Sequence, residues 1–378
     1  MGKVSKPKFK LLVFCISFIL CAGYFCNQAA CPAHAKKAEN LEKEYAKKAA
    51  KLLKKMTWHE KIAQMILVAV PDDAAGIQEE YQFGGYVLFA NDFENKTPVS
   101  VRNRIKQIQN ASKIPMLIAV DEEGGTVVRA SKYRQFRSQP YASPRNVFAA
   151  GKWDGIIKDT KSKAKFLKGL GINTNLAPVA DTAYSQSDFI YKRSFSANAD
   201  STAKYVKKVV TVMGEENLVS TLKHFPGYGN NGDTHTQLIH DHRSKAVFEH
   251  RDLKPFQAGI KAGCDMVMVS HNIVHCLDSQ NPASISPKVI SYLRKDMGFD
   301  GVIVTDSLTM DGVTDYTGNI GKSAVCAVLA GNDLLCTSEY KKMYHALIQA
   351  VKNKEITKKQ INESVERILL MKCKRGIV

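Results

Sequence analysis

The sequence predicts an α/β fold, a single-domain (β/α)8 (TIM) barrel. From residue 62 onward, short apolar segments alternate with longer amphipathic ones, and eight of the short segments have the length of buried strands. Polar residues follow five of these eight segments at the same end. The 378 residues are enough for such a barrel without a further domain. A doubly wound open sheet is the alternative.

The candidate strands are short apolar runs between polar turns, at residues 65–70, 86–90, 116–120, 172–178, 219–222, 266–269, 302–304 and 333–335. The expected helices are amphipathic segments, at residues 99–111, 153–170, 201–217, 247–263, 287–297, 320–330, 341–352 and 358–374. A charged helix is expected at residues 38–55. Because no low-complexity linker interrupts this pattern, it indicates one domain.

Residues 1–35 are predicted to precede the barrel, which then occupies residues 36–378. Four lysines come before an apolar run at residues 11–26, and Ala33-His34-Ala35 offers small residues for cleavage. This is the pattern of a secretory signal peptide. The apolar run also has the minimum length for an uncleaved membrane anchor, and lipidation of Cys31 is a third alternative. Each of these places the protein outside the cytoplasm, secreted or attached to the cell envelope.

The formal net charge is +18, of which the four leader lysines supply +4, leaving +14 for the rest. Basic residues concentrate in segments such as 36–55 and 158–168, which suits an anionic environment. They are not interleaved with aromatic residues, so no nucleic-acid partner is expected. Four of the nine cysteines lie in the leader and no C-x-x-C occurs, which argues against a disulfide scaffold or a zinc knuckle.

The fifth candidate strand opens into a long loop rich in glycine and proline, residues 223–235. Lys223 and His224 stand at its base, and Asp233 and His235 form an Asp-x-His pair at its tip. An acid two residues from an imidazole can orient the ring and raise its basicity. Residues 227–232 match G-x-G-x-x-G, but no helix follows, so we reject a dinucleotide site.

The polar residues that follow strands predict a shared pocket, because the carboxyl ends of barrel strands meet on one face. These residues are Asp121, Glu122, Glu123, Asp181, Lys223, His224, His271, Asn272 and Asp306. A carboxylate at a strand end, such as Asp306, is costly to leave unpaired, so it is either a structural ion pair or a catalytic group. If Arg129 and Arg193 join this pocket, their forked guanidinium groups would bind vicinal hydroxyls, as a sugar site requires.

Several motifs resemble those of family 3 glycoside hydrolases, in the β-N-acetylglucosaminidase branch. The motifs begin at Asp121 (Asp-Glu-Glu-Gly-Gly-Thr-Val-Val-Arg), Asn175 (Asn-Leu-Ala-Pro-Val-Ala-Asp), Arg193 (Arg-Ser-Phe-Ser), Lys223 (Lys-His-Phe-Pro-Gly-Tyr-Gly, leading to Asp-Thr-His) and Val304 (Val-Thr-Asp-Ser-Leu-Thr-Met). They occur in the family's order and cover roughly residues 55–375. Tyr228, Glu122 and Ile239 depart from the residues usual in the family, which affects loop shape more than chemistry.

The resemblance implies a single-domain (β/α)8 barrel with a retaining mechanism and neither metal nor cofactor. By carry-over, Asp306 is the nucleophile, and His235 paired with Asp233 is the acid/base. The terminal sugar would be bound by Asp121, Arg129, Arg193, Lys223, His224 and, on a weaker match, His271. The expected activity is that of an exo-β-N-acetylglucosaminidase acting on cell-wall (peptidoglycan) fragments or related glycans through a covalent glycosyl-enzyme.

Other functions stay open at this point. The same family would accommodate a β-glucosidase or, because histidine repels an anionic acceptor less than a carboxylate would, a GlcNAc phosphorylase. A non-catalytic sugar-binding envelope protein and a metal-dependent hydrolase using His235, His240, Asp241 and His242 are further alternatives. We expect a monomer.

The composition of the catalytic loop also predicts its dynamics. Three glycines, Gly227, Gly229 and Gly232, together with two asparagines, give the segment many backbone conformations. We therefore expect the loop to be mobile when the site is empty, with His235 far from Asp306 until substrate closes the site. Replacing Gly229 and Gly232 with alanine would then lower kcat with little loss of thermal stability.

Overall fold

The computed structural model describes residues 32–378, so the predicted leader lies outside the described residues apart from its last four positions. The chain divides into two units, residues 1–41 and residues 42–378. Of the first unit, the structure describes the start of helix α1 (Pro32–Lys55). The second unit holds all the other elements. In the described part of the chain, no helix is both long and apolar enough to cross a bilayer.

Eight parallel strands wind into a ring in the order β10-β1-β2-β3-β4-β5-β7-β9. They are β1 (Ile66–Ala69), β2 (Gly85–Leu88), β3 (Leu117–Val120), β4 (Thr174–Asn175), β5 (Val219–Phe225), β7 (Met266–Val269), β9 (Val302–Thr305) and β10 (Leu335–Thr337). A bridge between Val304 and Leu334 links the two ends of the sheet. The predicted barrel is thereby confirmed, and all eight predicted strands belong to it.

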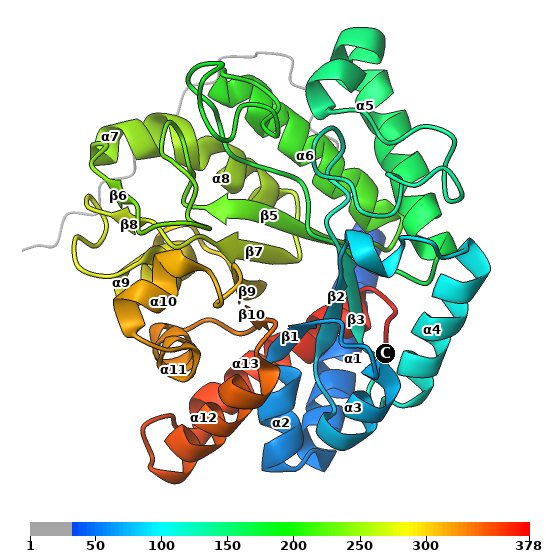
Figure 1. Ribbon diagram of the computed structural model, residues 1–378, viewed down its shortest axis with the longest axis vertical. Coiled ribbons are helices and arrows are strands. Elements are labelled where there is room, and N and C mark those ends of the chain that lie inside the picture. The colour runs from blue at the N-terminus through cyan, green and yellow to red at the C-terminus, as the bar shows by residue number, and fades with distance from the viewer. Residues whose placement is uncertain (1–31) are drawn as a thin grey trace, which may run out of the picture. The chain divides into compact units, whose positions relative to one another are not determined.

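Helices surround the strands (Figure 1). The α-helices after α1 are α2 (Trp58–Gln64), α3 (Ala74–Tyr81), α4 (Pro98–Asn110), α5 (Pro144–Gly169), α6 (Ala199–Glu215), α7 (Lys245–Val247), α8 (Leu253–Lys261), α9 (Pro287–Ser291), α10 (Asp311–Thr317), α11 (Ile320–Ala330), α12 (Tyr340–Lys352) and α13 (Lys358–Lys374). Shorter helical turns are η1 (Ala90–Asp92), η2 (Phe248–Asp252), η3 (Ala283–Ile285) and η4 (Tyr292–Asp296). A separate two-stranded ribbon pairs β6 (His240–Asp241) with β8 (Ile273–Val274).

Two elements differ from the expected boundaries for local reasons. Helix α5 begins at Pro144, nine residues before the expected start, because Ser143 caps it and proline suits the first helical position. The helix is kinked at Lys152, whose φ of 51° is not helical. Strand β4 keeps only two of seven expected residues; Pro178 follows shortly after, and proline cannot donate to a ladder.

Most strand residues are apolar because both faces of the sheet are covered; the main exceptions are β4 and the residues Ser220, Thr221, Lys223 and His224 of β5. Strands β2, β3, β7 and β9 have no exposed residue, as parallel sheets require when helices pack outside and side chains fill the inside. On helix α6, Val206, Val210 and Met213 form one buried face. Each such side chain stabilises the fold by roughly 1.5–3 kcal/mol.

Helix α13 buries a lysine side chain against the barrel. Lys372 of α13 is fully buried, and its Nζ donates to Oε1 of Gln64 at 2.9 Å. Burial lowers the pKa of this amine to about 7.

Candidate active site

A pocket opens at the carboxyl ends of the strands and gathers residues from most of the ring. Eight of the nine predicted site residues line it, from Asp121 after β3 to Asp306 after β9. The complete lining is Val87, Phe89, Asp121, Glu123, Val127, Arg129, Leu176, Phe189, Arg193, Lys223, His224, Asp233, His235, Met268, Asp306, Ser307 and Cys336. Of the nine polar residues expected to share a pocket, Asp121, Glu123, Lys223, His224 and Asp306 line it, whereas Glu122, Asp181, His271 and Asn272 do not.

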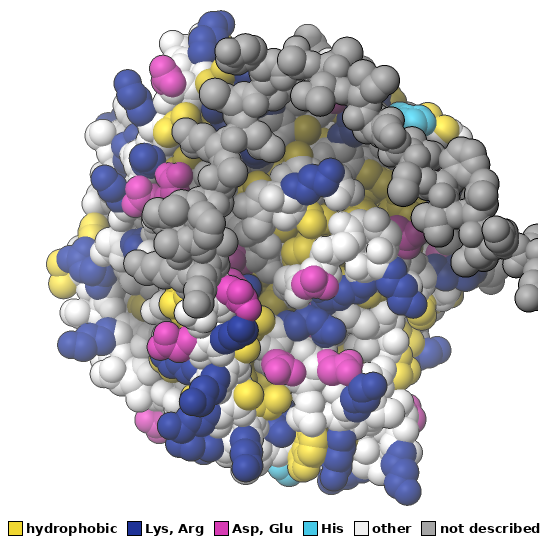
Figure 2. Space-filling view, turned by 180° about the vertical axis from the view of Figure 1, so that it is seen from behind, with side chains coloured by type: hydrophobic (Ala, Val, Ile, Leu, Met, Phe, Trp, Pro, Cys, Tyr) yellow, Lys and Arg dark blue, Asp and Glu magenta, His cyan; other side chains and the backbone are white. Residues whose placement is uncertain are grey.

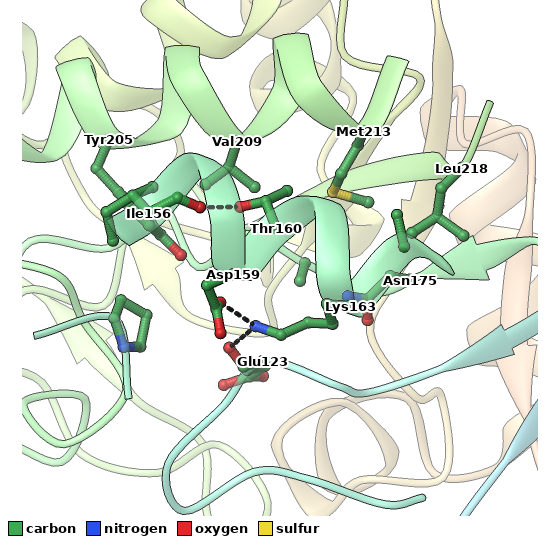
Figure 3. A pocket seen from close by; sticks show the side chains of 13 residues that line it. Glu123, Ile156, Asp159, Thr160, Lys163, Asn175, Tyr205, Val209, Met213 and Leu218 are labelled. Carbon is green, nitrogen blue, oxygen red and sulfur yellow. Dashed lines mark hydrogen bonds and ion pairs between the residues drawn. The ribbon is translucent and has the colours of Figure 1, made fainter. Parts of the chain in front are cut away.

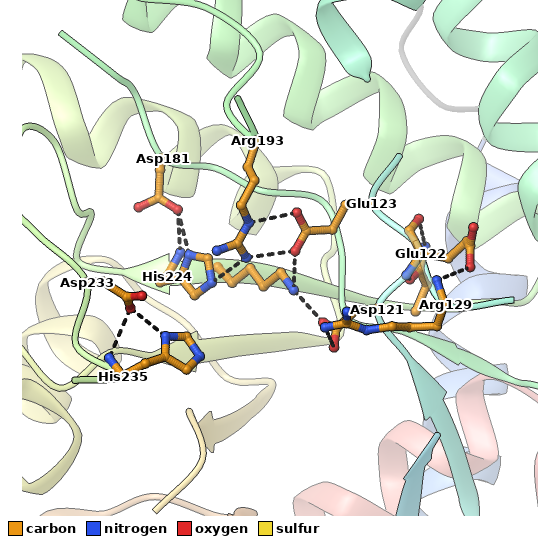
Figure 4. A network of polar contacts seen from close by, with 11 residues as sticks. Asp121, Glu122, Glu123, Arg129, Asp181, Arg193, His224, Asp233 and His235 are labelled. Carbon is orange, nitrogen blue, oxygen red and sulfur yellow. Dashed lines mark hydrogen bonds and ion pairs between the residues drawn. The ribbon is translucent and has the colours of Figure 1, made fainter. Parts of the chain in front are cut away.

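One wall of the pocket is a buried network of ion pairs (Figure 4). Lys223 Nζ lies 2.6 Å from an oxygen of Asp121 and 2.6 Å from an oxygen of Glu123. Arg193 binds Glu123 with two nitrogens, at 2.8 and 3.0 Å. Burial alone would raise the pKa of Glu123, but Arg193 and Lys223 hold it well below its usual range. Burial opposes the charge of Lys223 too, yet Asp121 and Glu123 raise its pKa.

Asp121 and Arg129 are partly exposed members of this wall. Arg129 Nη2 lies 3.5 Å from Asp121 Oδ2, and their side chains are 29% and 13% exposed. The guanidinium of Arg129 also lies over the ring of Phe89, 5.9 Å from its centroid. A carboxylate and a guanidinium can thus both reach a ligand in the pocket.

The ring of His224 is fixed at both nitrogens (Figure 4). Nδ1 lies 2.7 Å from Asp181, and Nε2 lies 3.0 Å from Arg193 Nη2. Because guanidinium nitrogens only donate, Nε2 accepts from Arg193 and Nδ1 donates to Asp181. Asp181 also accepts from the backbone N–H of His224 and of Tyr228, so it fixes the base of the catalytic loop.

Asp306 is partly buried at the end of β9 and forms no ion pair with a lysine or arginine in the described part of the chain. Its Oδ1 accepts from the backbone N–H of Ser307 at 2.8 Å. Burial would raise the pKa of Asp306, but His224, His271, the Ser307 N–H and His235 together lower it. The side chain is therefore an ionised carboxylate whose second oxygen is not engaged by these groups.

His271 does not line the pocket, unlike the other predicted site residues. It is fully buried, with Nε2 2.9 Å from the carbonyl oxygen of Ser307 and Nδ1 2.7 Å from the Ser284 hydroxyl. Since a carbonyl only accepts, Nε2 carries the proton, and burial lowers the pKa of the ring. His271 thus supports the turn that follows Asp306 and offers no free nitrogen to a ligand.

The Asp-x-His pair stands at the tip of the loop. Asp233 Oδ1 lies 2.5 Å from His235 Nδ1 and also accepts from the His235 backbone N–H at 2.9 Å. The two side chains are 33% and 55% exposed. Because Asp233 holds Nδ1, the other ring nitrogen is left for the pocket. His235 and Asp306 line the same pocket. That His235 lies far from Asp306 until substrate closes the site stays a prediction.

The first half of the loop is fastened rather than mobile. Tyr228 is buried, and its hydroxyl lies 2.6 Å from that of Thr234. Arg243 donates to the carbonyl oxygen of Gly227 at 2.7 Å. A Cβ on Gly229 would lie 1.9 Å from the guanidinium of Arg243, and its φ is 57°. Gly229 is therefore required for close packing and a left-handed backbone, not for mobility.

Glu122 and Glu123 follow Asp121 directly in the sequence, but the sequence does not predict their contacts. Glu122 is buried and accepts from the backbone N–H of Arg129 and of Ala130 and from the hydroxyl of Ser131. It shapes the loop that carries Arg129. Glu123 meets partners 70 and 100 residues further along the chain, a proximity that local sequence does not encode.

A second, small cavity lies behind Glu123, between α5 and α6 (Figure 3). Lys163 of α5 donates to the carbonyl oxygen of Glu123 at 3.0 Å and pairs with Asp159 at 3.2 Å. These contacts brace the backbone of the pocket wall from outside.

The four residues of the metal-dependent alternative do not form one cluster: His240 and His242 gather with His275, with ring centroids 4.1–6.3 Å apart, whereas His235 pairs with Asp233. Asp241 is buried against Arg243, and His240 Nδ1 lies 3.0 Å from Nε2 of His275. Within residues 32–378, no group of three or more His, Cys, Asp or Glu side chains could hold a metal ion. The metal-dependent reading therefore has no ligand set in this part of the protein.

A closed parallel barrel with an ion-paired polar pocket at the strand carboxyl ends is the architecture of a (β/α)8 enzyme. Residues 57–371 match the model of the glycosyl hydrolase family 3 N-terminal domain. The chain therefore belongs to glycosyl hydrolase family 3.

Individual relatives agree with this assignment. Beta-hexosaminidase A of Pseudoalteromonas piscicida is 29% identical over 338 residues, covering 82% of this chain and 56% of that protein. An uncharacterized secreted glycosyl hydrolase of Arthroderma benhamiae is 28% identical, with 79% and 87% covered. The structure of a family 3 β-N-acetylglucosaminidase from Paenibacillus sp. str. FPU-7 superimposes with a TM-score of 0.79 at 29% identity, covering 85% of this chain and 63% of that one. The chain thus spans little more than half of the first relative.

Proposed function

We propose that the protein is a retaining exo-β-N-acetylglucosaminidase. The observation that carries the proposal is that Asp306, an ionised carboxylate, and His235, oriented by Asp233, face one pocket with a prebuilt polar wall. The names of the relatives, β-hexosaminidase and β-N-acetylglucosaminidase, support the choice of sugar.

In this proposal the polar wall binds the terminal sugar. Asp121 and Arg129, which are partly exposed, accept from and donate to its hydroxyls. Arg193, Lys223 and His224 hold the wall rigid, and Arg193 and Lys223 present the remaining donors. Because the wall is closed beneath by the buried pair of Lys223 and Glu123, a chain end fits better than a chain interior, which supports exo action.

The first chemical step forms the covalent intermediate. An oxygen of Asp306 attacks the anomeric carbon while protonated His235 gives its proton to the glycosidic oxygen, whose bond to that carbon breaks. The general rule for retaining enzymes places a second carboxylate here. A histidine fulfils the same requirement because Asp233 orients its ring.

The second step releases the sugar. Neutral His235 takes a proton from water, the water oxygen bonds to the anomeric carbon, and the bond to Asp306 breaks. Two inversions give net retention. His271 acts through Ser307 as a positioning residue for the nucleophile and not, as first expected, as a sugar ligand.

We propose cell-wall (peptidoglycan) fragments or related GlcNAc-terminated glycans as substrates, met outside the cytoplasm by a monomeric enzyme. The leader pattern of residues 1–35, ahead of a barrel at 36–378, and the secreted relative support this location.

The test is turnover of an aryl β-GlcNAc and an aryl β-glucoside, each with and without phosphate. The proposal expects hydrolysis of the GlcNAc substrate and no dependence on phosphate. Preference for the glucoside would indicate a β-glucosidase, and a sugar phosphate product would indicate a phosphorylase. Binding without turnover would indicate a sugar-binding envelope protein.

A further inference from the structure

Helix α1 presents a strongly basic surface that the proposed reaction does not use. Five lysines within nine residues are all exposed: Lys47, Lys48, Lys51, Lys54 and Lys55. At 3.6 residues per turn they fall within about one third of the helix circumference. Among the described residues, none of the five forms an ion pair with a carboxylate. We call this surface the α1 lysine face.

The opposite side of α1 packs against the barrel. Ala49 is fully buried, and Tyr45, Leu52, Leu53 and Met56 pack against the core. These apolar positions lie on the helix face away from the lysines. Packing therefore fixes the direction of the lysine face, which points outward from the barrel.

The lysine face lies at the end of the barrel opposite the active site. Tyr45 lines a groove with Pro115, Asn173 and Asn217, which directly precede strands β3, β4 and β5. Lys55 shares a second pocket with Gln82 and Ile114, which precede β2 and β3. Helix α1 thus crosses the amino-terminal ends of the strands, whereas Asp306 and Lys223 lie at their carboxyl ends.

The groove beside α1 continues the basic character. Among the described residues that line it, Lys168, Lys374 and Arg375 are basic and none is acidic. Lys374 and Arg375 have partners, Glu42 at 2.6 Å and Asp265 at 2.7 Å, so the groove is partly neutralised. On α1, the one acidic residue next to the exposed lysines of residues 47–55 is Glu44. Basic side chains also predominate over acidic ones in Figure 2.

We propose that the α1 lysine face docks the barrel on an anionic phospholipid surface, with the active-site mouth turned away from it. Charge complementarity supports this partner, because several lysines next to an apolar segment are attracted to anionic lipid headgroups. The order of the chain supports it too, since only residues 27–31 separate the apolar run at 11–26 from the start of α1. The proposal does not depend on the glycosidase assignment.

The test measures flotation of the full chain with vesicles of phosphatidylcholine alone or mixed with phosphatidylglycerol. Binding to the neutral vesicles reports the apolar leader. The gain on anionic vesicles reports the basic residues, which include the four leader lysines as well as the α1 lysine face. Replacing the five lysines with glutamine should lower that gain at least tenfold, and added salt should do the same to the unaltered protein.

A charge-matched control replaces Lys96, Lys245, Lys322, Lys341 and Lys342, which are exposed at or just before helix starts on the catalytic side. It should keep the gain, and both variants should keep the melting temperature. Equal loss in the control, or a gain that survives the α1 substitutions, would overturn the proposal. Lysine-dependent binding to dextran sulfate without binding to anionic vesicles would also overturn it, in favour of a soluble polyanion.

Discussion

The two sides of the pocket are built in opposite ways. On the polar wall, Lys223 and Glu123 are 3% and 2% exposed and form several short ion pairs before any ligand binds. At the loop tip, Asp233 and His235 are 33% and 55% exposed and are joined mainly to each other. The wall is buried and ion-paired, whereas the side chains of the tip are partly exposed on a backbone that Thr234 anchors through its bonds to Tyr228 and Gly312.

The contrast separates binding from proton transfer. Charged groups that bind a sugar must be oriented and desolvated, and a buried network achieves this at the cost of dependence on every partner. A proton donor must reach leaving groups of different shape, which favours a partly exposed position. Damage to the wall should therefore cost stability, and damage to the tip should cost only rate.

The largest effect is expected at Asp306, which lies between the two sides. Asp306→Asn should lower kcat on an aryl β-GlcNAc by on the order of 10⁴-fold or more, because an amide cannot form the glycosyl bond. The melting temperature should change little, since no lysine or arginine is left unpaired in the described structure. A 2-fluoro or 5-fluoro glycoside should label Asp306 in mass spectrometry, and a label on another residue would contradict the assignment.

The wall is tested by Lys223→Met. The substitution leaves Asp121 and Glu123 without their shared cation, and breaking a buried pair costs about 3–5 kcal/mol. Denaturant unfolding measures this loss. The matched control is Lys245→Met, because its pair with Glu249 is exposed and should contribute no more than about 1 kcal/mol. Equal losses in the two variants would show that the wall is not prebuilt as described.

The tip is tested by His235→Ala. Glycosides with poor leaving groups should slow by roughly 10²–10⁴-fold, and activated aryl glycosides much less, because they need little protonation. Stability should be unchanged, since the ring is more than half exposed. If both substrate types slow equally, His235 binds or orients and does not transfer the proton.

The smallest effects should separate the two halves of the loop. Gly229→Ala meets Arg243 and a left-handed backbone, so it should destabilise the protein by about 1–3 kcal/mol. A Cβ on Gly232 first meets Ile239 at 3.4 Å, which is ordinary contact, so Gly232→Ala should leave the free energy of unfolding almost unchanged. Thermal melts of the two single variants check this. Similar melting temperatures would restore the view that both glycines serve mobility.

The sequence was sufficient for much of the fold and of the site. Apolar periodicity located all eight strands. The family resemblance named nine site residues, and eight of them line one pocket. The sequence could not predict the features that depend on contacts between residues far apart in the chain. Glu123 is ion-paired with Arg193 and Lys223. Arg243 holds the loop through its bond to Gly227. The bonds of His271 to Ser284 and Ser307 determine its role. Local rules do explain the early start of α5, since Ser143 caps the helix and Pro144 suits its first position.

The buried amine of Lys372 makes the stability of the barrel depend on proton binding. Its pKa is about 7 in the fold, against about 10.4 in an unfolded chain. Between these values the unfolded chain binds more protons than the fold, so the free energy of unfolding should rise with pH from 7 towards 10. Below pH 7 the fold must hold a cation against the amide oxygen of Gln64, the one hydrogen-bond partner given to it among the described residues. In Lys372→Met this contribution to the pH dependence should vanish. The increase in the free energy of unfolding relative to the unaltered protein should therefore be largest at low pH.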